Sequence, residues 1–534
     1  MKTESVLDVI FEQALVLDGT GGPIFTTDVA LVGDRIARVG DCVGRDAVQR
    51  IDCRGLALSP GFIDMHGHSD EALFALPTAD SKIMQGVTLE IGGNCGMSPG
   101  PFSPATLLER RSELRSHFNI ETTSEDLGGF LDALEAAPPA MNFACLVGLG
   151  NSRSAVGGVL PGPLTKEALD QQCELVRAAC ERGAIGVSSG LIYQPGSFAD
   201  IAELAALATA AAKGGSPLYA SHIRSEGDRL VEAVDEALDV GMRTDVAVQL
   251  SHHKASGKRN WGKVHDTLAK VEKARGFGLD VVLDQYPYKA SSTGLDVILP
   301  ADVNVGTRRE IADRLADPFY FSLTTRRVDA EYRERWHEVL IASVGSDANR
   351  RFEGMTVDAI AAERGMPPAE TAVGLLRDEA LDVAAIYFTM CEDDLRTVMG
   401  YRETCIGSDA SVRALEGVTA RGKPHPRAFG TFPRVFKYYV REAKVLSIEE
   451  AVRRSCGLPA GRLGLRERGL VAEGFFADLV LFDPATIADT ATYEDPHRYP
   501  DGIRYVFVNG TAVVREGRLT GLRPGKVLRR GRDL

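Results

Sequence analysis

The sequence predicts an α/β protein: a closed (β/α)8 barrel that carries a metal site, accompanied by a small β-sandwich domain. Three observations predict this fold. Apolar runs of strand length alternate with helix-like stretches through the middle of the 534-residue chain, which is typical of a parallel sheet. Both ends of the chain contain only short strand-like runs. Side chains that bind metals follow several of the central runs, at the end where barrels place their functional residues.

The two ends of the chain are expected to form one β-domain. Short apolar runs separated by turn residues occur up to about residue 58 and again from about residue 474. Asn509-Gly510, between two of the later runs, is a strong hairpin pattern. We therefore expect residues 1–58 and 471–534 to build the β-sandwich from both termini, and residues 59–470 to form the barrel.

Eight apolar runs in the middle of the chain are the predicted barrel strands. Helix-like stretches separate them, for example at 166–182, 201–213, 230–240 and 263–275. Parallel strands need long crossovers, and eight of them close a barrel. The predicted strands are 56–63, 87–91, 143–147, 184–187, 217–220, 246–250, 281–283 and 404–406.

The stretch from about residue 300 to residue 346 interrupts this alternation. It is rich in charged residues, as in the segments TTRR and EYRER. We expect it to be an insertion after the seventh barrel strand, in the position of a lid.

Composition and charge narrow the classes of function. The chain has 61 lysines and arginines against 74 aspartates and glutamates, and this net charge of −13 argues against binding to nucleic acid or acidic membranes. Its nine scattered cysteines are expected to be thiols in a reducing compartment. The first residues do not resemble a signal peptide, and no uncharged apolar run reaches about 18 residues. We expect a cytoplasmic protein that acts on a small molecule; the sequence does not indicate its oligomeric state.

Residues of metal-ligand type follow the predicted strands. His66 and His68 come after the first strand and share a face, because alternate side chains of a strand point the same way. An isolated pair of this kind is more often part of a turn, but four further candidates follow other strands. They are Cys95, His222, His252 and Asp409, after the second, fifth, sixth and eighth strands. The pattern indicates a divalent metal at the carboxyl ends of the strands.

Some of these candidates have ordinary alternatives. Cys95 can be a buried thiol, although the glycines around it leave room for close approach of the backbone. His253 stands beside His252, and only one of two neighbouring strand residues can point inward. Asp409 can be the N-cap of the following helix, although Ser408 can serve there instead.

The same residues lie in segments that resemble the amidohydrolase superfamily, and within it the N-acyl-D-amino-acid deacylase (D-aminoacylase) family. The resemblance covers nearly the whole chain outside 300–380. It is carried, in order, by PGFIDMHGHSD, GGNCGMSP, GVSSGLIYQPGSFAD, ASHIRSEGD, LSHHKASGKRNWGK, LDQYPYKASST, IGSDA and HPRAFGTFPRV, and by the tail PAGRLGLRERGLVAEGFFADLVLFDP.

The resemblance implies two neighbouring metal positions. The tight zinc site consists of Cys95, His222 and His252. The second, weaker site consists of His66, His68 and Asp409. A thiolate and two imidazoles with one open position suit a catalytic zinc ion. In the family register His252 is the ligand, and His253 is left as a packing residue.

The resemblance also implies a reaction. It is the zinc-dependent hydrolysis of an N-acyl-D-amino acid to a carboxylate and a free D-amino acid. Asp409 is expected to act as general acid and base, taking a proton from the activated water and giving it to the leaving amine. Arg224 and Glu226 are expected to support His222 from behind.

A substrate of this kind carries a carboxylate, which needs a cation or several hydrogen-bond donors. Lys254 is the first candidate, because it lies two residues after His252 on the same face. Tyr193, Tyr286 and Ser292 are candidate hydroxyl donors, and Arg413 can contact an acidic substrate side chain. Tyr286 can equally be a packing aromatic, and Arg413 a solvated loop residue. Since no arginine follows 291–293 closely, neutral D-amino acids are favoured over acidic ones.

Four alternatives stay open at this point: a cyclic-amide hydrolase of the dihydroorotase or hydantoinase type, a D-dipeptidase, a nucleobase deaminase, and a scaffold without activity. Lys254 and the tyrosines suit a carboxylate better than a purine, which counts against the deaminase. Relatives of the first type usually carry a carboxylated lysine after the fourth strand, where this chain has Val187-Ser188-Ser189-Gly190. A scaffold without activity is expected to lose metal ligands, and this chain keeps all six candidates.

Overall fold

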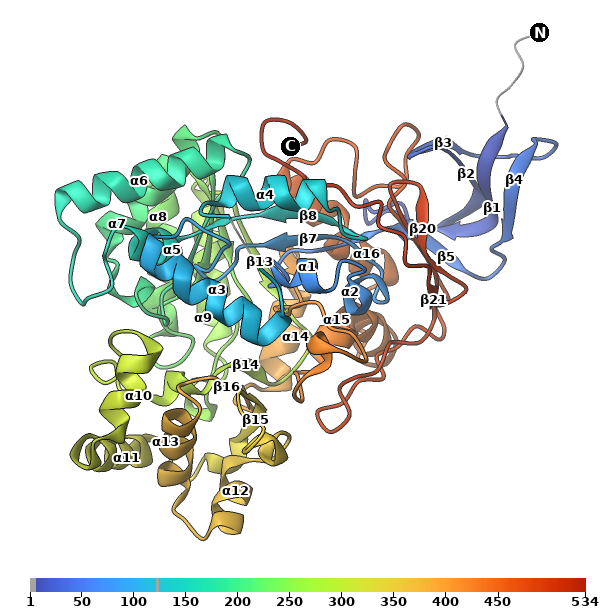
Figure 1. The fold of residues 1–534 in the computed structure, drawn as a ribbon. Helices are drawn as coiled ribbons and strands as arrows, with labels where there is room; N and C mark the ends of the chain where they lie inside the picture. Colours follow the sequence, from blue (N-terminus) through green and yellow to red (C-terminus); the bar gives the residue numbers. More distant parts are fainter. Residues whose placement is uncertain (1–5, 122–123) are drawn as a thin grey trace.

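Strands from both ends of the chain form one nine-stranded sheet, in a computed structural model that describes residues 6–121 and 124–534. Figure 1 shows these blue and red strands on one side of the molecule. Strand β5 joins the two ends, because it pairs with β1 on one side and with β18 on the other. The predicted β-structure built from both termini is therefore confirmed. The strands are β1 (Leu7–Val16), β2 (Phe25–Val32), β3 (Arg35–Val39), β4 (Ala47–Asp52), β5 (Ala57–Pro60), β18 (Leu479–Phe482), β19 (Ile503–Val508), β20 (Thr511–Arg515) and β21 (Arg518–Leu519).

The middle of the chain forms the predicted (β/α)8 barrel. Its paired strands are all parallel, and β8 continues into β9 after a single residue. The barrel closes where β17 meets β6: the amide of Met65 donates to the carbonyl of Ile406 at 3.3 Å, and Gly67 bridges Ala410. The strands are β6 (Phe62–Asp64), β7 (Val87–Gly92), β8 (Asn142–Cys145), β9 (Val147–Gly148), β10 (Val187–Gly190), β11 (Leu218–His222), β12 (Ala247–Leu250), β13 (Val281–Gln285) and β17 (Thr404–Ile406).

Two barrel strands differ from their predicted bounds. The apolar run 56–63 is divided at Gly61 between the terminal sheet and the barrel. Only glycine fits at this point, since a Cβ there would lie 2.1 Å from the hydroxyl oxygen of Thr88. The fourth strand begins at Val187, where the predicted run ends, and continues through the small buried residues Ser188 and Ser189. Hydrophobicity alone places this strand too early.

Helices follow the barrel strands, and the four predicted ones are present as α6, α7, α8 and α9. The side chains of Thr165 and Asp200 cap the first amide groups of α6 and α7. No helix within the described residues is both long and apolar enough to cross a lipid bilayer. The helices outside the insertion are α1 (Ala72–Ala75), α2 (Asp80–Ile83), α3 (Pro104–Phe118), α4 (Leu127–Ala136), α5 (Leu149–Ala155), α6 (Lys166–Glu181), α7 (Ile201–Lys213), α8 (Leu230–Thr244), α9 (Val264–Gly276), α14 (Glu392–Gly400), α15 (Arg427–Arg434), α16 (Ile448–Ser455) and α17 (Gly457–Leu463), with a π-helix, η7, at Val435–Glu442.

An additional unit follows β13 and has a hydrophobic core of its own, which includes Trp336 and Phe352. It combines a three-stranded sheet with helices and lies at the lower edge of the molecule in Figure 1. These elements run from residue 291 to residue 387, so the unit is longer than the predicted insertion at 300–346. The prediction missed residues 347–387, which form two helices and a strand, since helices and strands also alternate in the barrel. They are β14 (Ser291–Gly294), α10 (Arg308–Ala316), α11 (Pro318–Tyr332), β15 (Val339–Val344), α12 (Val357–Arg364), α13 (Pro368–Asp378) and β16 (Val383–Tyr387).

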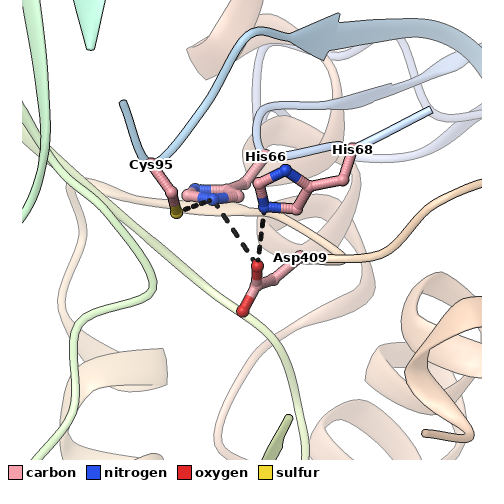
Figure 2. A group of neighbouring side chains, drawn as sticks. All are labelled: His66, His68, Cys95 and Asp409. Carbon is pink, nitrogen blue, oxygen red and sulfur yellow. Dashed lines mark hydrogen bonds and ion pairs between the residues drawn. The ribbon is translucent and has the colours of Figure 1, made fainter. Parts of the chain in front are cut away.

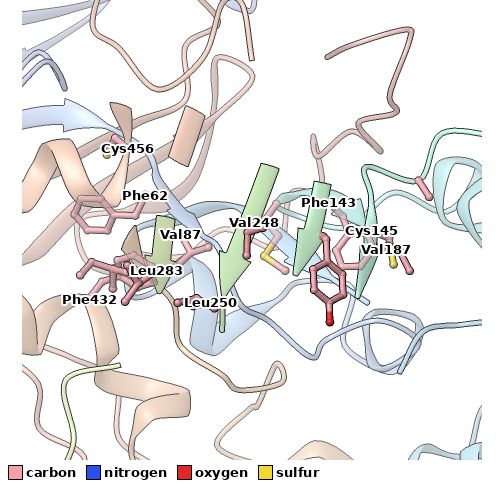
Figure 3. Close-up of a cluster of buried hydrophobic side chains, with 14 of the residues drawn as sticks. Phe62, Val87, Phe143, Cys145, Val187, Val248, Leu250, Leu283, Phe432 and Cys456 are labelled. Atoms are coloured by element: carbon pink, nitrogen blue, oxygen red, sulfur yellow. The ribbon is translucent and has the colours of Figure 1, made fainter. Parts of the chain in front are cut away.

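The barrel and the terminal sheet meet in an aromatic cluster around Phe62 of β6 (Figure 3). The ring of Phe62 stacks on Phe432 with centroids 5.4 Å apart and on Phe436 at 5.5 Å. It also contacts Phe482 of β18 at 6.4 Å. One fully buried side chain therefore joins the first barrel strand, α15 and the terminal sheet.

We expect Phe62→Ala to lower the free energy of unfolding by about 3–5 kcal/mol, because it leaves a cavity among three rings. Urea unfolding followed by circular dichroism measures this loss. Leu108→Ala, at a position that is 69% exposed, is the control and is expected to change stability by less than about 0.5 kcal/mol. Equal effects of the two substitutions would show that the cluster does not hold the two units together.

Candidate functional site

The six candidate ligands meet at the carboxyl ends of the barrel strands. Three of them have left-handed backbone conformations: φ is 54° at Cys95, 34° at His252 and 51° at Asp409. Such a conformation costs about 1–3 kcal/mol for a residue other than glycine and is concentrated at functional sites. The backbone is also fixed across the closure of the barrel, since the amide of Asp409 donates to the carbonyl of His66 at 2.7 Å.

The ligand atoms form two clusters that share the Cys95 sulfur. His66, His68, Cys95 and Asp409 form the first cluster, shown in Figure 2, and Cys95, His222 and His252 form the second. Within each cluster all ligand atoms lie within 4.8 Å of one another. The Cys95 Sγ atom is 3.2 Å from His66 Nε2 and 3.4 Å from His252 Nε2.

The second cluster has the donor set and the unsatisfied groups expected of a zinc site. Both ring nitrogens of His222 are buried, and neither makes a hydrogen bond to the described residues. His252 points inward, whereas the Nε2 atom of His253 lies 2.8 Å from the hydroxyl of Thr267 behind the barrel wall. A thiolate and two imidazoles that converge on one point fit a tetrahedral zinc ion with one open position.

Charge in the cluster keeps the anionic ligands ionised. Burial alone would raise the pKa of the Cys95 thiol, but the neighbouring His66 and His252 imidazoles lower that pKa well below its ordinary value. Burial would likewise raise the pKa of Asp409. The guanidinium of Arg427, 2.8 Å from the Asp409 carboxylate, outweighs burial and holds this pKa well below the usual range.

Asp284, at the end of β13, orients two of the histidines. Its carboxylate lies 3.2 Å from His66 Nδ1 and accepts a 2.8 Å hydrogen bond from the amide of His252. A partner on Nδ1 directs Nε2 of the same ring to the cluster. Glu226 has a similar role on the other side, where its carboxylate is 2.9 Å from His252 Nδ1. We predicted that Glu226 and Arg224 support His222, but the Glu226 carboxylate lies nearer to His252, and Arg224 pairs with Glu236. We missed Asp284, although a carboxylate at the end of a buried strand was a usable sign.

Lys82 of α2 ties together the loops that carry the first cluster. Its fully buried ammonium donates to Asp64 at 2.7 Å, to the hydroxyl of Ser408 at 2.8 Å and to the carbonyl of Ala410 at 2.8 Å. Glu90 of β7 lies 2.9 Å away. Burial would lower the pKa of Lys82, but these two carboxylates raise it, so the lysine stays charged.

A cavity of about 500 Å³ opens above the clusters. Four of the five predicted substrate-binding residues line it: Lys254, Tyr193, Tyr286 and Ser292. Arg413 does not, because its guanidinium turns away and donates to the carbonyls of Thr419 and Arg421.

Arg427 takes the place in the cavity that was expected for an arginine after the eighth strand. It lies on α15, pairs with Asp409 and sits over the ring of Tyr286, 4.6 Å from the centroid. We missed this residue because the segment HPRAFGTFPRV begins 16 residues after Asp409, and sequence distance does not show that α15 returns to the cavity.

Known proteins resemble this chain over its whole length. The amidohydrolase family pattern matches residues 402–514. An N-acyl-D-glutamate deacylase of Alcaligenes xylosoxydans xylosoxydans is 38% identical over 98% of this chain and 97% of its own length. A D-aminoacylase of the same organism is 36% identical over 98% of both chains. The crystal structure of an N-acyl-D-glutamate deacylase from Bordetella bronchiseptica, with zinc and a phosphonate mimic of the tetrahedral intermediate, matches with a TM-score of 0.81 and 33% identity, over 98% of this chain and 100% of the other.

We expect Lys82→Met to destabilise the protein by about 3–5 kcal/mol, because it leaves Asp64 and Glu90 buried without a cation. Adding Glu90→Gln to this variant is expected to recover part of the loss. Urea unfolding measures both effects. Lys270→Met is the matched control: it breaks an ion pair with Asp235 at the surface and should cost less than about 1 kcal/mol. If Lys82→Met lowered the free energy of unfolding no more than the control does, Lys82 would not be what holds these loops together.

Proposed function

Because the chain belongs to the N-acyl-D-amino-acid deacylase (D-aminoacylase) family of the amidohydrolases, we propose that it hydrolyses the amide bond of N-acyl-D-amino acids. The products are a carboxylate and a free D-amino acid. The observation that carries this proposal is the ionised Asp409 carboxylate beside a buried cluster of one thiolate and two imidazoles, at the floor of a cavity.

Zinc is the proposed cofactor. Cys95, His222 and His252 are its proposed ligands, and His66, His68 and Asp409 with the shared thiolate are proposed to form a second, weaker site. The two buried ring nitrogens of His222, which make no hydrogen bond within the described residues, support the first assignment. Bound zinc polarises the acyl carbonyl and activates water for attack.

Asp409 is the proposed general acid and base. Its Oδ1 atom lies 3.1 Å from His68 Nε2 and 3.6 Å from His66 Nε2, so it faces the reacting centre. Its low pKa keeps it ready to accept the proton of the attacking water at neutral pH. The same oxygen then delivers that proton to the leaving nitrogen, which departs as a neutral amine.

Lys254 is the proposed partner of the substrate carboxylate, with the hydroxyls of Tyr193, Tyr286 and Ser292 as further donors. Its side chain is only 4% exposed and already pairs with Glu226, so it is held in place rather than free to rotate. Within the described residues, the hydroxyl of Tyr286 makes one hydrogen-bond contact, to the Met390 sulfur at 3.9 Å. Its hydroxyl is therefore available to a substrate.

The substrate side chain is proposed to be neutral. Among the described residues, the lysine and arginine side chains that line the cavity are Arg110, Lys254 and Arg427. Each already pairs with a carboxylate, from Glu71, Glu226 and Asp409 respectively. One of them can turn to the α-carboxylate, but a second substrate carboxylate has no free cation.

We also propose two domains: a β-domain built from both ends of the chain, 1–58 and 471–534, and a barrel with its insertion, 59–470. The pairing of β5 with β18 supports a β-domain from both ends, and because β5 extends to Pro60 we place the first limit at that residue. The cytoplasm is the proposed location. The nine free thiols support a reducing compartment.

We expect the zinc-loaded protein to release free D-methionine from N-acetyl-D-methionine. Cys95→Ala should lower kcat by at least about 1,000-fold and reduce bound zinc, because it removes the anionic ligand. An amine-release assay and elemental analysis measure the two effects, and Cys180→Ala, a buried thiol within α6, is the matched control. A protein that binds zinc but turns over no N-acyl amino acid would exclude the proposed reaction.

N-acetyl-D-methionine and N-acetyl-D-leucine should be better substrates than N-acetyl-D-glutamate by roughly 100-fold in kcat/KM, since an unpaired carboxylate in the cavity costs several kcal/mol. Competition assays with mixed substrates measure this ratio directly. A preference for D-glutamate would mean that one of the three cations leaves its carboxylate partner when substrate binds.

A further inference from the structure

The cavity has two chemically different halves, which are lined by different segments of the chain. Loops after β11, β12 and β13, together with α15, supply the polar half: Glu226, Lys254, Tyr286, Ser292 and Arg427. Segments after β7 and β10, together with α3, supply the other half, where the apolar side chains of Met97, Phe102, Phe118 and Ile192 lie beside the polar side chains of Thr106, Glu109, Arg110 and Glu113. The shared Cys95 thiolate lies after β7, between the two metal clusters.

Large apolar side chains of the second half face the open cavity. Met97 is 51% exposed and Ile192 is 36% exposed, although both line a cavity next to a buried cluster. Phe102 precedes α3 and Phe118 ends it, and both rings are half-buried. Apolar side chains that stay exposed inside a concave site are typical of a surface that a ligand covers.

The one cation of this half has no capacity for an anion. The guanidinium of Arg110 donates two hydrogen bonds to the Glu71 carboxylate, at 2.9 Å and 2.8 Å, and a third to Glu113 at 3.1 Å. Its charge is therefore neutralised, and its aliphatic stem adds to the apolar surface. A substrate carboxylate belongs in the opposite half, beside Lys254.

Amide geometry then fixes which part of the substrate reaches α3. In a trans amide the acyl substituent and the α-carbon of the amino acid lie on opposite sides of the C–N bond. When the substrate's α-carboxylate pairs with Lys254, the acyl substituent points across the metal clusters to the other half of the cavity. The methyl of an acetyl group would leave most of that half uncovered.

We propose that the half of the cavity formed by Met97, Phe102, Phe118 and Ile192 is an acyl pocket that takes apolar acyl groups longer than acetyl, such as straight-chain acyl groups of four to eight carbons. This inference rests on the proposed deacylase function and names its substrate class. Phe118 lies on α3, Phe102 precedes this helix, and Met97 and Ile192 follow β7 and β10, so these segments rather than the metal ligands set the acyl preference.

The test is the hydrolysis of N-acetyl-, N-butyryl-, N-hexanoyl- and N-octanoyl-D-methionine by the zinc-loaded full-length protein. We expect kcat/KM to rise about two- to four-fold for each added methylene up to hexanoyl, because each methylene leaves water. Turnover of the acetyl substrate without any gain for longer chains would overturn the acyl pocket and leave the deacylase function standing. No turnover at any chain length would overturn both.

Variants separate an acyl pocket from a pocket for the amino-acid side chain. Phe102→Ser and Ile192→Ser, on two different elements, should each lower the ratio of hexanoyl to acetyl kcat/KM by roughly five-fold. Leu108→Ser, on an exposed part of α3 outside the cavity, should leave both the ratio and the basal activity unchanged. An unchanged ratio in both pocket variants would overturn the proposal. The proposal would also be overturned if the pocket variants lowered the preference for long D-amino-acid side chains instead of the preference for long acyl groups. The ratio of kcat/KM for N-acetyl-D-norleucine to that for N-acetyl-D-alanine measures the side-chain preference.

Discussion

The buried ammonium of Lys82 joins the first and last strands of the barrel, and the position of the metal clusters depends on that junction. On one side, Asp64 accepts from Lys82 and also from the amide of His66 at 3.2 Å. On the other side, Ser408 contacts the same ammonium and precedes Asp409 in the chain. Without a charge at this point, two carboxylates and a hydroxyl would be buried without a cation, and the two loops would be joined only by hydrogen bonds such as that from the amide of Asp409 to the carbonyl of His66.

The same need for charge balance shapes the rest of the site. The Cys95 thiolate is stabilised by the imidazoles around it, and Asp409 is stabilised by Arg427. Asp284 is a third buried anion, and its pKa is lowered by His66 despite the opposing effect of burial. Each anion thus faces a cation or an imidazole from a different strand. Such cross-strand pairs can also offset the left-handed backbone at Cys95 and Asp409, which costs about 1–3 kcal/mol per residue.

The sequence was sufficient to predict the barrel, the β-structure from both termini and the convergence of the six candidate ligands. Strand ends are visible as ends of apolar runs, and residues after the ends of parallel strands must meet. The residues that support the ligands were harder to find. Lys82 lies in a four-residue helix and Arg427 at the start of α15, and both reach the site only because the barrel closes. The prediction that Arg413 contacts the substrate was wrong for the converse reason. Arg413 is near Asp409 in sequence, but its loop turns the side chain away from the cavity.

Paired cations also limit how a substrate can bind. An incoming α-carboxylate must compete with Glu226 for Lys254 or with Asp409 for Arg427. Competition at Arg427 would raise the pKa of Asp409, because it withdraws the charge that opposes burial, and a more basic Asp409 transfers protons more readily at neutral pH. Competition at Lys254 would instead loosen Glu226, which supports His252. A carboxylate that approaches between the two cations therefore has different consequences for Asp409 and for His252, and the polar half of the cavity links substrate binding to both side chains.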